Sequence, residues 1–96
     1  MHRSAEAHEA LLQTARNVFA PQAFDPQREE SKLQEIVRYA LDHGGVEGPV
    51  DLLRFMSAMD RHARRIYPGM PMIDALWLTA QGAIAAKAQM AMMRGP

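Results

Sequence analysis

The chain has 96 residues, which is room for one domain, and it contains no cysteine. The lack of cysteine excludes disulfides, thiolate metal sites and cysteine nucleophiles, and it fits a reducing compartment. Eleven basic and eleven acidic side chains balance, so no net charge draws the protein toward nucleic acid or an anionic membrane.

The sequence shows neither a signal peptide nor a membrane span. Glu6 and Glu9 interrupt the N-terminal segment, which therefore lacks the apolar region of a signal peptide. The longest apolar stretch, residues 72–93, contains Asp74 and Lys87 and is too polar to cross a bilayer. We therefore expect a soluble, cytoplasmic protein without membrane association.

Prolines and glycines divide the chain into four segments with helical periodicity, and no stretch alternates with the period of a strand. We predict an all-α fold of four helices in a single small domain, residues 1–96. The predicted helices span about 4–20, 26–43, 49–67 and 71–93.

The first two helices have recognisable ends and one apolar stripe each. Ser4 and Asp25 are expected to cap their N-termini, with Pro26 in the first helical position. Gly44 is expected to end the second helix in the left-handed conformation. The predicted stripes are Leu11, Leu12, Ala15, Val18 and Phe19, then Leu33, Ile36, Val37, Ala40 and Leu41.

The third helix pairs a wide apolar face with a basic stripe. The apolar face comprises Leu52, Phe55, Met56, Met59, Ala63 and Ile66. The basic stripe comprises Arg54, Arg61, Arg64 and Arg65. Because guanidinium groups bind carboxylates in a bidentate manner, this stripe is a candidate surface for an acidic partner.

The fourth helix has apolar residues in nearly every direction and must be covered all round. Three shorter helices cover only part of it, so we expect this long C-terminal helix to be the spine of a homodimer or the surface that binds another protein. Gly82 interrupts the helix at a cost of about 1 kcal/mol relative to alanine, which indicates a packing role. Two copies crossing at Gly82 about a two-fold axis would explain it; the alternative is that Gly82 admits the first or second helix of the same chain. The predicted partner or dimer interface is Met72, Ile73, Leu76, Trp77, Thr79, Gly82, Ala83, Ala86, Met90 and Met93.

No motif indicates an enzyme. His8-Glu9 begins like the zinc-binding HExxH helix, but Leu12 stands at the second ligand position. Gly44, Gly45 and Gly48 follow no strand and precede no lysine, so they do not form a phosphate loop. We predict no catalytic residues, no cofactor and no metal.

DNA binding through the basic stripe is an alternative function. Ala40 and Gly44 have the spacing of a helix-turn-helix motif, but the segment in the place of a recognition helix, residues 46–51, carries two acids and a proline. It offers no side chain suited to read base edges, so we expect no nucleic-acid partner.

In length, lack of cysteine and its long final helix, which begins Met72-Ile73-Asp74-Ala75-Leu76-Trp77, the chain resembles the small helical quorum-sensing antiactivators of bacteria. The resemblance concerns the overall format of the chain, and no functional residue is carried over from it. It implies a cytoplasmic dimer that binds a LuxR-type transcriptional regulator and blocks its DNA binding. A secretion-system or phage accessory protein, acting as a chaperone, is the other protein-binding alternative.

Overall fold

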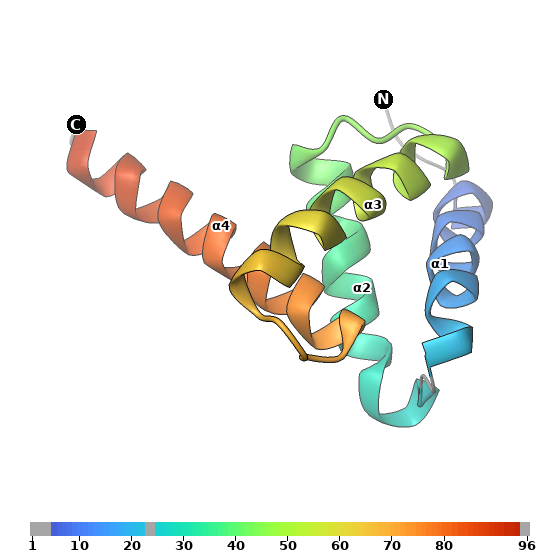
Figure 1. The fold of residues 1–96 in the computed structure, drawn as a ribbon. Coiled ribbons are helices and arrows are strands. Elements are labelled where there is room, and N and C mark those ends of the chain that lie inside the picture. Colours follow the sequence, from blue (N-terminus) through green and yellow to red (C-terminus); the bar gives the residue numbers. More distant parts are fainter. Residues whose placement is uncertain (1–4, 23–24, 95–96) are drawn as a thin grey trace.

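The computed structural model describes residues 5–22 and 25–94, which contain four α-helices, one 3-10 turn and no strand. In chain order the elements are α1 (Ala5–Phe19), η1 (Ala20–Gln22), α2 (Pro26–His43), α3 (Pro49–Ile66) and α4 (Met72–Arg94) (Figure 1). The predicted four-helix fold is confirmed, and every helix end lies within one residue of its predicted position. The expected cap Ser4 lies outside the described residues.

One apolar core joins α1, α2, α3 and the first half of α4. The predicted stripes supply it, with Phe19, Leu33 and Leu52 among the fully buried side chains. Ile66 was predicted in this core, but its exposed fraction is 51% because it lies on the edge of α3 rather than on its buried side. The buried residues of α4 all come from its first half and are Ile73, Ala75, Leu76 and Ala80.

The ends of α2 show one prediction confirmed and one corrected. The Asp25 side chain caps α2, accepting a hydrogen bond of 3.0 Å from the backbone N–H of Gln27. Gly44 does not take the left-handed conformation, since its φ is −100°; the left-handed residue is Gly45, with φ of 65°. A Cβ at Gly44 would lie 2.5 Å from the ring of Phe55, so glycine is required there for space against α3.

Polar contacts fasten α4 to α2 along one side. Lys32 Nζ lies 2.6 Å from Asp74 Oδ1, and Lys87 Nζ lies 3.1 Å from His43 Nδ1. Between these pairs, the indole N–H of Trp77 donates to the Glu35 carboxylate. Residue numbers rise together in both helices, so α2 and α4 run in the same direction. Because α2 ends at His43, opposite Lys87, the last part of α4 extends past it (Figure 1).

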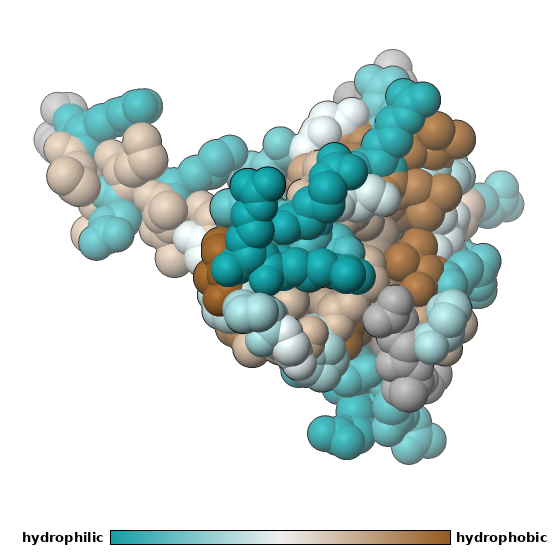
Figure 2. Space-filling model, viewed as in Figure 1, coloured by the Kyte–Doolittle hydropathy of each residue, from teal (hydrophilic) through white to brown (hydrophobic). Residues whose placement is uncertain are grey.

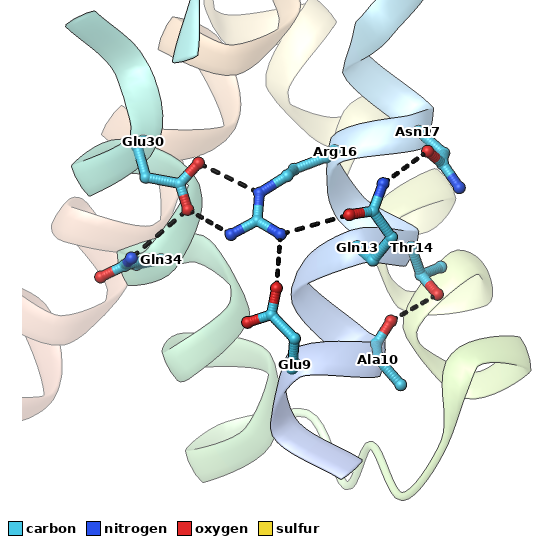
Figure 3. A network of polar contacts seen from close by, with 8 residues as sticks. All are labelled: Glu9, Ala10, Gln13, Thr14, Arg16, Asn17, Glu30 and Gln34. Carbon is cyan, nitrogen blue, oxygen red and sulfur yellow. Dashed lines mark hydrogen bonds and ion pairs between the residues drawn. The ribbon is translucent and has the colours of Figure 1, made fainter. Parts of the chain in front are cut away.

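Arg16 of α1 ties that helix to α2 through a partly buried network (Figure 3). Its Nη2 donates to Glu30 Oε2 at 2.7 Å and its Nε to Glu30 Oε1 at 3.2 Å, while Nη1 donates to Glu9 at 2.8 Å. Gln34 also donates to Glu30, at 3.3 Å. The hydrogen bonds from Arg16, with a smaller contribution from Gln34, hold the pKa of Glu30 below its ordinary value, although burial acts in the opposite direction.

The packing of Gly44 can be tested by substitution. Gly44→Ala should lower the free energy of unfolding by about 1 to 3 kcal/mol, because the new Cβ overlaps the Phe55 ring. The matched control is Gly82→Ala, where a Cβ would meet no atom within 4 Å. Since alanine is the better helix former, the control should raise the stability of the isolated chain by up to about 1 kcal/mol. Urea unfolding measures both, and equal effects at the two positions would contradict the assigned packing.

The Arg16–Glu30 contact predicts a pH-dependent stability. Glu30→Gln should lower the free energy of unfolding by about 1 kcal/mol at neutral pH, the magnitude of a partly solvated bidentate pair. The pKa of Glu30 is lower in the folded chain, so its contribution is fully present above the unfolded pKa and is lost as pH falls through the folded pKa. The difference between variant and wild type should therefore shrink below about pH 4.5. Asp42→Asn, at an exposed position of the same helix, should change stability by less than about 0.5 kcal/mol at neutral pH. A difference for Glu30→Gln that does not change with pH would refute the prediction.

Candidate functional site

The last part of α4, residues 84–94, projects from the body of the protein (Figure 1). Lys87 still contacts His43 at the end of α2, and the helix continues past that contact to Arg94. We call residues 84–94 the distal segment. Every side chain in it is exposed, including Met90 at 53%, Met92 at 81% and Met93 at 82%. Figure 2 shows pale apolar surface along this projecting helix, interrupted by a few hydrophilic side chains. The alanine- and methionine-rich surface of this segment is thus exposed in the described structure.

Where the distal segment leaves the body of the protein, α3 and α4 enclose an apolar groove of about 490 Å³. We call it the α3–α4 groove. Its lining residues are Tyr39, Phe55, Ala58, Met59, His62, Ile66, Tyr67, Leu78, Thr79, Gly82 and Ala83. In the part of the chain that the structure describes, no carboxylate lines it. Such a lining binds apolar side chains rather than a charged ligand.

Gly82 lies in this groove, and its role is not explained within the chain. A Cβ built at Gly82 would meet no atom within 4 Å among the described residues outside its own helical turn. The alternative that Gly82 admits the first or second helix of the same chain is therefore wrong. The space in front of Gly82 is open to a second molecule.

The groove continues onto the distal segment without a break. Steps of three and four residues place side chains on one side of a helix. Such steps connect the groove residues of α4 with exposed residues further along. This surface, which we call the α4 face, comprises Thr79, Gly82, Ala83, Ala86, Met90 and Met93. It is one apolar strip, walled by α3 in its first half and open in its second.

Three arginines of α3 border the groove. All three are exposed. Arg54 and Arg61 lie four and three residues from Ala58, and Arg65 lies three residues from His62, steps that place these arginines next to lining residues of the groove. We call them the arginine rim; Figure 2 shows the hydrophilic side chains that gather over α3. Arg64 lies elsewhere on the helix, where its Nε contacts Asp60 Oδ2 at 2.9 Å. The predicted basic stripe is therefore divided, with three of its members beside the groove.

The other predicted interface residues lie in or against the core of the chain itself. Ile73 and Leu76 are buried, and Met72 and Trp77 are partly buried against the core. Trp77, predicted in the partner or dimer interface, instead has Lys32 of α2 over its ring at 5.4 Å. These four residues hold α4 on the body of the protein, and the surface open to a partner begins at Thr79.

Sequence reasoning did not identify the α3 wall of the groove. Phe55 and Ile66 were predicted on the apolar face of the third helix, and His62 was not predicted as a site residue. Ala58 and Tyr67 were not considered as site residues. A signal was present, because Ile66 and Phe55 lie at one margin of an apolar face too wide to be buried completely.

In the described residues, no group of three histidine, cysteine or acidic side chains is arranged to hold a metal ion. No described helix is long and apolar enough to cross a membrane. No protein-family model, curated protein or solved structure matches this chain.

The division of α4 into a packed half and an open half can be measured. Met90→Ser with Met93→Ser should change the free energy of unfolding by less than about 0.5 kcal/mol, because both side chains are exposed. Leu76→Ala, in the packed half, should lower it by about 2 to 5 kcal/mol. A large loss in the methionine variant at low protein concentration would show that the chain itself covers the distal segment.

Proposed function

We propose that this protein acts by binding another protein through the α4 face and the α3–α4 groove. The observation that carries the proposal is the distal segment, whose apolar side chains are all exposed in the described structure and which runs directly into an apolar groove. Contiguous apolar surface of this kind is typical of protein-binding sites. Methionine, exposed at Met90, Met92 and Met93, adapts to irregular partner surfaces.

The resemblance to quorum-sensing antiactivators makes a LuxR-type transcriptional regulator the first partner to test. In this proposal the protein is a cytoplasmic regulator that acts by occupancy: the α4 face covers a surface that the regulator needs for dimerisation or DNA binding. No catalytic step is required, so the amount of inhibitor relative to regulator sets the response.

Self-association through the same face is the second candidate, and the open space at Gly82 favours it. Two α4 helices could approach closely there, because no side chain separates the backbones. A homodimer of this kind would use the surface that a partner protein uses. Self-association and partner binding would then compete.

The proposal is tested with two matched double variants. Met90→Glu with Met93→Glu places charge on the α4 face, and Val50→Glu with Leu53→Glu places the same charge on exposed apolar residues outside it. The first should weaken binding to a purified LuxR-type regulator from the same bacterium more than tenfold and restore the regulator's DNA binding in a gel shift, because charged groups resist burial in an apolar interface. The second should behave as wild type.

Two outcomes would contradict parts of this proposal. If the wild-type protein neither binds nor inhibits the regulator, the antiactivator function is refuted. If both double variants bind a partner that co-purifies with the wild type equally well, the α4 face is not the binding surface.

A further inference from the structure

We infer that the α3–α4 groove receives an amphipathic helix of the partner protein, with acidic residues along the flank that faces the arginine rim. This inference rests on the proposed protein-binding function and adds the chemistry of the segment that is bound.

The groove has the dimensions and lining for a helix. Its α3 wall runs from Phe55 to Ile66, and at about 1.5 Å per residue these two residues lie about 16 Å apart along the helix. Small residues of both walls, Ala58, Gly82 and Ala83, leave room for the backbone of a third helix. Larger side chains such as Phe55 supply apolar contacts for its stripe. Helix-in-groove recognition uses this combination of an apolar trough and apolar residues at three- and four-residue steps.

The charges beside the groove are positive, although the whole chain is neutral. The arginine rim lies along α3, and α4 after Asp74 carries Lys87 and Arg94 but no acid. The two acidic residues of α3 and α4 that follow Asp51 are both in ion pairs: Asp60 with Arg64, and Asp74 with Lys32. Guanidinium groups that are exposed beside an apolar trough are complementary to carboxylates flanking an apolar stripe.

Carboxylates of α2 do not alter this pattern. Glu35 and Asp42 line a second hollow together with Gln81 and Ile84. This hollow adjoins the groove at Tyr39, which lines both, but neither carboxylate lines the groove. Glu35 also accepts the indole N–H of Trp77. The groove therefore presents its partner with an apolar floor and a basic edge.

A second copy of this chain matches the groove less well than an acidic helix does. The segment that it could insert is the distal segment, whose charged residues are Lys87 and Arg94. Those cations would approach Arg54, Arg61 and Arg65, and like charges across an interface oppose association. Nucleic acid would match the rim alone and leave the apolar lining without a partner.

The test uses the full-length protein and two synthetic, fluorescently labelled helical peptides of about 18 residues. Both carry the same leucine stripe; one has glutamates on the flank and the other has lysines at the same positions. In fluorescence anisotropy the acidic peptide should bind about tenfold more tightly than the lysine peptide, the expected sum of several exposed ion pairs. Added salt should reduce the difference.

Charge reversal on the protein identifies the rim. Arg61→Glu with Arg65→Glu should abolish or invert the preference for the acidic peptide. The matched control, Arg28→Glu with Arg38→Glu, makes the same change in net charge at exposed positions of α2 outside the groove lining and should keep the preference. Circular dichroism verifies that both variants remain helical.

The remaining outcomes overturn the inference in distinguishable ways. Equal binding of both peptides means an apolar groove without charge selection, and the proposed protein-binding function survives. If neither peptide binds and the protein sediments as a dimer, a second copy of the chain fills the groove. If neither peptide binds but duplex DNA binds in a manner that depends on Arg61 and Arg65, the surface is a nucleic-acid interface. Both proposals then fail.

Discussion

The parallel pairing of α2 and α4 determines the shape of this protein. Contacts from Lys32–Asp74 to His43–Lys87 set the register of the two helices, and α2 ends where the second of these contacts is made. After Lys87, which lies opposite the end of α2, α4 continues for seven more residues to Arg94. Helical hydrogen bonds are local, and the alanine-rich sequence of this part favours the helical conformation beyond its last tertiary contact. The exposed distal segment is a consequence of this register.

The other end of the domain is held differently. The α1 helix is held by the burial of apolar side chains such as Leu11 and Phe19 and by the contact between Arg16 and Glu30 of α2. Such a contact adds little energy because solvent reaches it, but the two-point geometry of guanidinium and carboxylate fixes the position of one helix along the other. Apolar burial stabilises the domain, and the polar contacts select the arrangement that leaves α4 extended.

The α4 face joins two features that are individually ordinary in small helical proteins. An apolar helix end alone can be a frayed terminus, and an apolar groove alone can be imperfect packing. Here the groove residues Thr79 and Gly82 and the distal residues Met90 and Met93 share one side of one helix. Gly82 retains the cost of a helical glycine without any contact in the described chain that needs it. A contact with a second molecule at Gly82 would explain why glycine stands there despite this loss of helix stability.

The amino-acid sequence by itself determined the number of helices, their ends and most of the core, because proline and glycine positions, the Asp25 cap and three- and four-residue apolar steps act within a few residues. It also indicated that α4 is too apolar for its own chain to cover. Tertiary structure alone decided which part remains uncovered: Ile73, Leu76 and Trp77 lie in or against the core, whereas the distal segment does not. It also decided that Gly44 makes room for Phe55 and that Ile66 borders a groove. These outcomes depend on the register and crossing of helices far apart in sequence, which periodicity along one helix does not encode.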